Sequence, residues 1–272
     1  MKLLLIEWEK IRNYRAFWLM VALYLFVLIS AVIGLPAFFN YMTDKTNASV
    51  VTKLFTRLLL SFPDVWQNIA FFAGLRAFIK VVLAILVVIL ISNEFSFLTI
   101  RSNIINGLSR KHFLLAKIEL VFMLSLLSTL VLFLSGLYLG FVNTPTITFS
   151  QLFSRIYFLP AYFVELFTYL TFAMMIRILI RKTGFAIIAL LFYIMVEPII
   201  QYYTPDQFDK FLPLNAMNHL VWSVNTSSVS IKTPEINFTL QESIALTDLA
   251  VCLAYAVFFT GIIWFYLKRK DL

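Results

Sequence analysis

Six long apolar stretches restrict the fold of this chain more than any other feature. They cover residues 16–38, 71–92, 118–142, 156–180, 184–203 and 245–267. Each has about 20 residues or more, and a helix that rises about 1.5 Å per residue then crosses the roughly 30 Å hydrocarbon core of a bilayer. An open strand would leave backbone groups unpaired in lipid. We therefore expect six transmembrane helices in an all-α integral membrane protein.

The composition agrees with a chain that is embedded in lipid. Hydrophobic residues make up 61% and charged residues 13% of the 272 residues, whereas soluble domains have about 45–50% and about 25%. The chain has too little polar surface to cover a soluble globule, so we treat residues 1–272 as a single transmembrane domain. Its one cysteine, Cys252, excludes an intrachain disulfide and a cysteine-rich zinc site.

The basic residues indicate on which side the termini lie. An even number of spans places both termini on one side, and the segments on that side carry most of the 22 lysines and arginines. By the positive-inside rule this side is cytoplasmic, so we expect a multi-pass protein of the cell inner membrane with both termini in the cytoplasm. The basic residues behind the net charge of +8 then set the orientation of the chain in the lipid bilayer, and we expect no nucleic-acid partner. The cations concerned are Lys2, Lys10, Arg12, Arg15, Arg101, Arg110, Lys111, Lys117, Arg177, Arg181, Lys182, Lys268, Arg269 and Lys270.

Residues 1–15 precede the first span and are expected to form an amphipathic helix. Trp8 and Ile11 fall on one stripe at helical spacing, while Lys10 and Arg12 lie mostly away from it. Such a helix would lie in the cytoplasmic interface with Trp8 at headgroup level. Two interpretations stay open: an anchor that only sets the topology, or a docking surface for another protein.

The motifs of nucleotide, metal and hydrolytic chemistry are absent from the sequence. There is no G-x-x-x-x-G-K-[ST], no G-x-G-x-x-G and no H-E-x-x-H. The two histidines, His112 and His219, stand far apart in the sequence. We therefore expect no catalytic residue, metal site or cofactor in this chain, and no hydrolysis of a nucleotide by this chain alone.

The most informative connection is the cytoplasmic segment 94–117. It is longer than a tight helix hairpin needs, and Gly107 to Ser109 interrupts its pattern. A short helix followed by a turn is expected, with an apolar face that is buried against the membrane interface or a partner protein. The alternative is a basic, solvated turn that only obeys the positive-inside rule. The apolar residues at helical spacing are Leu98, Ile100, Ile104, Ile105 and Leu108.

At this segment the chain resembles the permease subunits of type-2 ATP-binding-cassette (ABC) exporters. The six spans, the Glu-x-x-Lys-x-Arg pattern before the first span and a long outer connection at 204–243 also match, so the resemblance covers nearly the full length. Leu98 departs from the pattern, because many members have glycine before the threonine. The matching positions of the segment are Glu94, Thr99, Arg101, Gly107, Ser109, Arg110, Ala116 and Lys117.

The resemblance implies a mechanism and its partners. Two permease copies, or one copy and a related permease, would pair in the membrane. Each would dock segment 94–117 as a coupling helix on a separate ABC ATPase that binds ATP and Mg²⁺, and the N-terminal helix would brace the same contact. ATP hydrolysis would then drive export by alternating access. The substrate is not named by the sequence.

Two other classes of function stay open. One is a non-transporting membrane component that couples an ATPase to an assembly or mechanical task in the cell envelope. The other is a self-contained secondary transporter, which the sequence disfavours because we find no inverted repeat and no helix broken by Gly or Pro at the midplane.

Four charged residues fall well inside the expected spans, away from the first and last turns. Arg76 and Lys80 are four residues apart on one helix face, and Glu165 lies at a depth of about 13 Å that matches Lys80. Glu197, before Pro198, is near the outer end of the fifth span. A lone charge at such depth costs several kcal/mol, so we expect Lys80 and Glu165 to pair. Snorkelling, a substrate path or outer gate, and different span boundaries are the alternatives.

Two further patterns predict local packing. Gly136 and Gly140 form a G-x-x-x-G pair that permits close approach of another helix. In the outer connection, prolines separate short apolar pieces such as 211–224, which indicates one or two short helices packed on the outer mouth.

Overall fold

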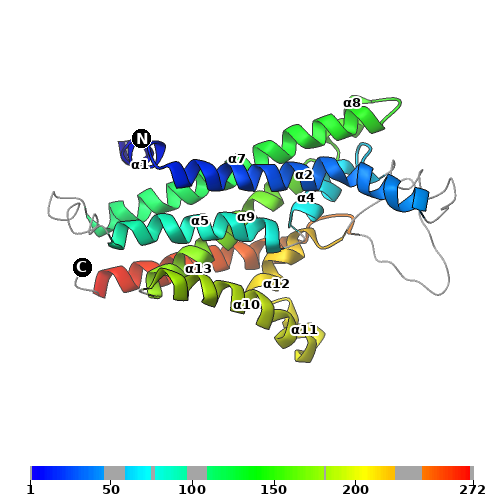
Figure 1. The fold of residues 1–272 in the computed structure, drawn as a ribbon. Helices are drawn as coiled ribbons and strands as arrows, with labels where there is room; N and C mark the ends of the chain where they lie inside the picture. The colour runs from blue at the N-terminus through cyan, green and yellow to red at the C-terminus, as the bar shows by residue number, and fades with distance from the viewer. Residues whose placement is uncertain are drawn as a thin grey trace.

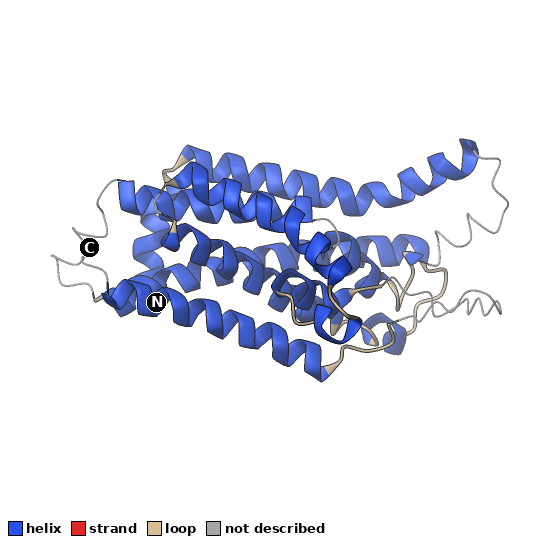
Figure 2. Cartoon of the chain, turned by 90° about the horizontal axis from the view of Figure 1, so that it is seen from below, coloured by secondary structure: helices blue, strands red, loops and turns tan. Residues whose placement is uncertain are grey.

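The computed structural model describes residues 2–45, 59–74, 77–96, 109–180, 182–223 and 241–269. Within these ranges every regular element is a helix, which confirms the all-α prediction for this part of the chain (Figures 1 and 2). The elements are α1 (Lys2–Arg12), α2 (Arg15–Lys45), α4 (Val65–Gly74), α5 (Ala77–Ser96), α7 (Arg110–Asn143), α8 (Phe149–Phe153), α9 (Phe158–Leu179), α10 (Thr183–Tyr203), α11 (Asp206–Asp209), α12 (Pro213–Asn218), the 3₁₀ helix η1 (His219–Val221) and α13 (Leu246–Arg269).

In the part of the chain that the structure describes, six helical segments are long and apolar enough to cross a membrane, as the sequence predicts. They are α2, α5, α7, α9 together with α8, α10 and α13, and the long helices run side by side as a bundle (Figure 1). Helix α1 and the last turns of α13 lie at the same end of this bundle. The chain is therefore a multi-pass membrane protein.

The boundaries of the last three spans agree with the prediction to within a few residues, but the second span does not. The sequence predicts one helix over 71–92, whereas the structure has two, α4 and α5. Helix α4 is buried inside the protein at the end of the bundle, with Trp66 and Ile69 fully enclosed. Apolarity does not distinguish a helix that faces lipid from one that is enclosed by protein, so the two pieces merge in the sequence pattern.

The first and third spans are longer than predicted. Helix α2 continues to Lys45, so the first part of the expected outer loop is helical. Helix α7 begins at Arg110 instead of near 118, because the Ser109 hydroxyl accepts a hydrogen bond from the His112 backbone N–H and caps the helix. The prediction that 94–117 forms a separate segment is thus wrong at both ends, where residues 94–96 belong to α5 and 110–117 to α7.

Helix α9 is the centre of the bundle. It packs against α5, α7 and α13, and most of its side chains are buried. Helix association in lipid relies on close packing and on hydrogen bonds between helices, because lipid tails are as apolar as leucine. The buried polar side chains of α9, such as Glu165 and Tyr162, are accordingly the ones that find partners on neighbouring helices.

The glycine pair of α7 confirms the predicted close approach and shows which segment it receives. A Cβ atom at Gly136 would lie 2.6 Å from the Ile69 side chain and 2.7 Å from Trp66, and at Gly140 it would overlap the Phe62 ring. The glycines therefore make room for α4 and the turn before it.

The outer connection contains short helices, as predicted. Helices α11, α12 and η1 lie between α10 and α13, and residues 224–240 are outside the described ranges. Helix α12 packs against α9 and α13. This places its last residue, Asn218, beside the charged residues of the bundle.

Candidate functional site

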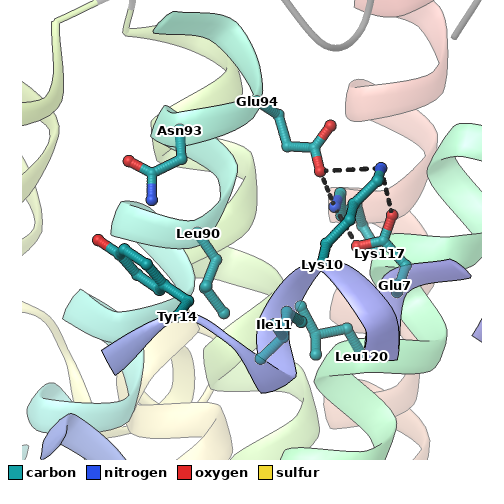
Figure 3. Close-up of a pocket in the computed structure, with 9 residues that line it drawn as sticks. All are labelled: Glu7, Lys10, Ile11, Tyr14, Leu90, Asn93, Glu94, Lys117 and Leu120. Atoms are coloured by element: carbon teal, nitrogen blue, oxygen red, sulfur yellow. Dashed lines mark hydrogen bonds and ion pairs between the residues drawn. The ribbon is translucent and has the colours of Figure 1, made fainter. Parts of the chain in front are cut away.

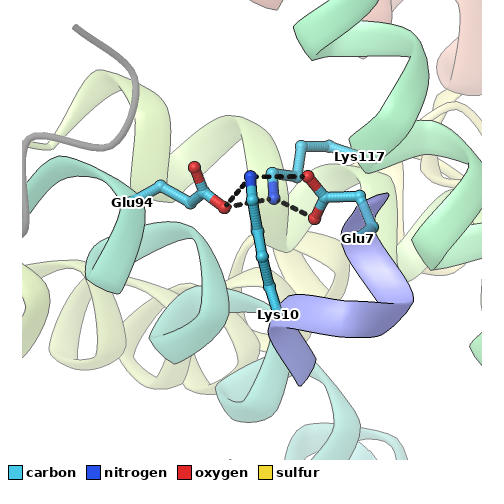
Figure 4. A network of polar contacts seen from close by, with 4 residues as sticks. All are labelled: Glu7, Lys10, Glu94 and Lys117. Carbon is cyan, nitrogen blue, oxygen red and sulfur yellow. Dashed lines mark hydrogen bonds and ion pairs between the residues drawn. The ribbon is translucent and has the colours of Figure 1, made fainter. Parts of the chain in front are cut away.

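Four charged side chains meet where α1 crosses the ends of α5 and α7 (Figure 4). Lys117 on α7 forms an ion pair with Glu7 on α1, and its Nζ lies 2.9 Å from Glu94 Oε1 on α5. The Lys10 Nζ lies 3.3 Å from Glu7 Oε1 and 3.3 Å from Glu94 Oε1. We call these four residues the charge cluster. It joins α1 to the helices α5 and α7, which are far from α1 in the sequence.

The charge cluster is mostly withdrawn from solvent. Glu7, Glu94 and Lys117 are nearly fully buried, and the side chain of Lys10 is 32% exposed. Two carboxylates and two ammonium groups neutralise one another, and such pairing is what makes buried charges tolerable. Partial burial lowers the pKa of Lys10, but the Glu7 and Glu94 carboxylates outweigh it, so its pKa is raised above the ordinary value. Lys10 therefore stays cationic.

A tryptophan pair holds α1 against the start of α2. The rings of Trp8 and Trp18 pack edge to face with centroids 5.9 Å apart, and Trp18 Nε1 donates to the Arg12 carbonyl at 2.9 Å. Ile11, one turn after Trp8 on α1, is buried in the bundle. The tryptophan pair and Ile11 therefore fix α1, and this positions Glu7 and Lys10 for the charge cluster.

The helix that starts at Arg110 is also tied to α13. Arg110 Nη1 donates to the backbone carbonyls of Leu267 and Lys268, at 2.8 Å each. These carbonyls belong to the C-terminal turn of α13, which lacks intrahelical partners and carries the negative end of the helix dipole. A guanidinium is well suited to that position.

The structure thus places only part of the predicted coupling segment. It unites Glu94 and Lys117, and it gives Ser109 and Arg110 capping roles. Thr99, Arg101 and Gly107 lie outside the described residues, as does Arg76.

Sequence reasoning named Lys10, Glu94 and Lys117 separately and missed that they meet through Glu7. The available signal was opposite charge at the ends of two consecutive spans, together with the i,i+3 spacing of Glu7 and Lys10.

The predicted pairing of Lys80 with Glu165 is confirmed. Lys80 on α5 forms a buried ion pair with Glu165 on α9, and neither side chain is more than 3% exposed. The Lys80 Nζ also donates to Asn218 Oδ1 on α12 at 3.2 Å and lies 5.6 Å from the centroid of the Tyr169 ring. The pair is therefore buried in protein and does not snorkel.

Glu197 meets the same short helix from another span. Its Oε1 accepts a hydrogen bond from the Asn215 backbone N–H at 2.7 Å, in the first turn of α12. Glu197 is 2% exposed, and a carboxylate at this position satisfies one of the N–H groups that a helix N-terminus leaves unpaired. Lys80 and Glu197 thus hold α12 at its two ends.

The comparisons with known proteins place the chain in a family. Residues 27–272 match the family model described as a protein of unknown function, DUF2705. The chain belongs to this family. A search of curated proteins found no match. The matched range contains all residues of the charge cluster except Glu7 and Lys10, which lie on α1 before it.

A cavity of about 190 Å³ adjoins the charge cluster of this DUF2705 chain (Figure 3). Its remaining lining comes from α1, the turn after it, α5 and α7. Those residues are Ile11, Tyr14, Leu90, Asn93 and Leu120. The cavity therefore combines apolar and polar walls at the end of the bundle.

Two buried polar groups of the DUF2705 chain were not foreseen. Ser128 on α7 hydrogen-bonds to Tyr162 at 3.0 Å and to Tyr24 at 2.5 Å, which links three spans. Arg177 was counted among the cytoplasmic cations that flank the short connection after α9, and the structure places it in the last turn of that helix. Its side chain is 2% exposed, donates to Ser92 and lies 5.0 Å from the Phe95 ring, and this burial was not predicted.

Among the described residues, no group of three or more His, Cys, Asp or Glu side chains is placed to hold a metal ion.

Proposed function

We propose that this DUF2705 chain is the transmembrane permease subunit of an ABC transporter, and that a separate ATPase binds ATP and Mg²⁺ and drives export. The observation that carries the proposal is the charge cluster. It clamps α1 to α5 and α7 at the two ends of segment 94–117, in which the family resemblance locates the ATPase contact.

To transmit force, a movement of the ATPase against segment 94–117 must displace the membrane spans together. Lys117 joins the last turn of α5 to the start of α7 and to α1, and Arg110 joins α7 to the end of α13. Helices α1, α5, α7 and α13 are therefore tied together at one end of the bundle, which we call the base. Ion pairs and charge-assisted hydrogen bonds are strong enough to keep such a base intact while it moves.

Helix α5 connects this base to the other end of the bundle. Glu94 and Lys80 are 14 residues apart on the same helix, which corresponds to about 21 Å along its axis. Lys80 contacts Glu165 and Asn218, so α5 links the charge cluster to the short helix α12. A movement at the proposed ATPase contact would thereby reach the proposed outer end.

The exposed face of α10 supports a second permease copy. Six large side chains recur at alternating intervals of three and four residues, and each is more than half exposed. This is the spacing at which two helices pack along one seam. The stripe consists of Phe185, Ile188, Phe192, Met195, Ile199 and Tyr202.

A crosslinking experiment tests the second copy. The only native cysteine, Cys252, is buried, so a cysteine placed at Met195 would be the only exposed thiol. In native membranes, Met195→Cys should give a dimer on mild oxidation, while Leu126→Cys on the exposed face of α7 should not. Equal dimer from both positions would indicate random collision and would contradict the α10 seam.

Purification from mild detergent tests the central proposal. A chain tagged at its C-terminus should bring with it a subunit that carries a Walker motif, and the eluate should hydrolyse ATP. Arg101→Glu should abolish the co-purification while insertion into the membrane stays intact. Recovery of the chain alone and inert would overturn the proposal, and an ATPase complex that moves no substrate in vesicles would favour a non-transporting role.

The charge cluster has its own test within that assay. Lys117→Met leaves the buried carboxylates of Glu7 and Glu94 with Lys10 as their one remaining partner in the cluster, so the base should loosen. We expect the ATPase to stay bound but to lose most of its stimulation by the permease. Lys111→Met is the matched control, because Lys111 is exposed on the same helix. Equal activity in both variants would show that the cluster does not transmit force.

A further inference from the structure

The cavity beside the charge cluster has two kinds of wall. Ile11, Leu90 and Leu120 form an apolar surface, and polar groups stand around it (Figure 3). The Asn93 amide and the Tyr14 hydroxyl lie on one side, and the Lys10 ammonium lies on the other. Such a combination fits an amphiphilic ligand better than a purely ionic one, because the apolar surface is covered only if the ligand carries hydrocarbon.

The polar groups of the cavity have hydrogen-bonding capacity left. Lys10 makes two contacts of 3.3 Å and has three N–H donors, and its side chain is 32% exposed. Within the described residues, the side chains of Asn93 and Tyr14 have no hydrogen-bond partner. Three donor groups therefore remain for a ligand that accepts hydrogen bonds.

The cavity lies at the level of the membrane interface. Trp8 and Trp18 pack together beside it and are each nearly half exposed, as expected for tryptophans that anchor a helix at the headgroups. The charge cluster itself is neutral, but its most exposed member is the Lys10 ammonium, which can form a charge-assisted hydrogen bond to a phosphate and so favours an anionic lipid.

We propose that this cavity binds an anionic phospholipid of the adjacent leaflet. Lys10 holds the phosphate, Asn93 and Tyr14 donate to glycerol or ester oxygens, and an acyl chain covers Leu90 and Leu120. The lipid then bridges α1 to α5 and α7 beside the charge cluster. This inference goes beyond the proposed function and does not rest on it, because lipid binding is measured without an ATPase.

Native mass spectrometry of the full chain, delipidated in non-ionic detergent, tests the proposal. The probes are phosphatidylglycerol and phosphatidylcholine with identical acyl chains. Phosphatidylglycerol should bind first and with one preferred stoichiometry, and Lys10→Gln should weaken it about tenfold, since a charge-assisted hydrogen bond is lost. Arg12→Gln, on the same helix but outside the cavity, should leave the affinity within about twofold, as expected for an exposed cation that makes only screened, long-range contacts.

A second variant keeps the test decisive if Lys10→Gln disturbs the charge cluster. Leu120→Phe fills the cavity and leaves all four charges in place, and it should also weaken phosphatidylglycerol binding, whereas Leu126→Phe on the lipid-exposed face of α7 should not. Equal binding of both lipids, or equal loss in Lys10→Gln and Arg12→Gln, would overturn the proposal. Displacement of the lipid by millimolar inorganic phosphate would assign the site to a free anion and would also overturn it.

Discussion

The buried ion pair between Lys80 and Glu165 allows the sharpest prediction of stability. Glu165→Gln keeps the shape of the side chain but removes its charge, so Lys80 loses its anionic partner and keeps only the new amide oxygen and that of Asn218 as acceptors among the described residues. Neither side chain is more than 3% exposed, so water cannot compensate.

The expected size of the effect follows from this burial. Removal of one partner from a buried ion pair costs about 3–5 kcal/mol, because the other charge is left uncompensated. We expect Glu165→Gln to fall at the lower end of this range, since the glutamine oxygen and Asn218 still accept hydrogen bonds from Lys80. For a chain of this length the loss corresponds to a fall in melting temperature on the order of 10 °C.

A double variant separates the ion pair from simple packing. Lys80→Met combined with Glu165→Gln removes both charges at similar volume, and it should recover much of the lost stability. Thermal unfolding in detergent, followed by tryptophan fluorescence, measures all variants. Glu242→Gln is the matched control, because the same chemical change at an exposed carboxylate should shift stability by less than about 0.5 kcal/mol. A double variant no more stable than the worse single variant would refute the reasoning.

Two further predictions concern packing and charge. Gly136→Val should prevent folding or lower the melting temperature strongly, because its Cβ would lie 2.6 Å from a buried side chain. Gly261→Val is the control and should be tolerated, because nothing lies within 4 Å of a Cβ at that position. Expression level and thermal unfolding measure both variants. Lys10 should react more slowly than the exposed Lys111 with an amine-acylating reagent at pH 9, because its raised pKa leaves less neutral amine, and peptide mass spectrometry would show it. Equal labelling of both lysines would contradict the raised pKa of Lys10. The stability that Lys10 contributes is fully present below its ordinary pKa of 10.5, and it is lost only as the pH rises through the higher pKa of the folded state.

The sequence by itself determined the number and approximate position of the spans. Length and apolarity are local properties, and a helix long enough to cross the bilayer satisfies its own backbone. Depth is also local, since it follows from residue number along a helix. This is why the pairing of Lys80 with Glu165 could be predicted from matched depths before any contact was known.

Only the tertiary structure decided which apolar and charged residues face protein. The apolar residues of α4 look like part of a span, yet Trp66 is fully buried and packs against Gly136 of α7. Arg177 is a cation near the end of a span in the sequence, yet its side chain is buried against Ser92. Apolarity and charge do not record what surrounds a side chain, because that depends on how helices cross.

The charge cluster shows the same limit. Glu7 and Lys117 are 110 residues apart, and they meet only because the tryptophan pair turns α1 back across the ends of α5 and α7. A sequence pattern can assign each charge to a helix end. Whether opposite charges then neutralise one another in a buried cluster depends on the crossing of three helices, and this geometry is a property of the folded bundle.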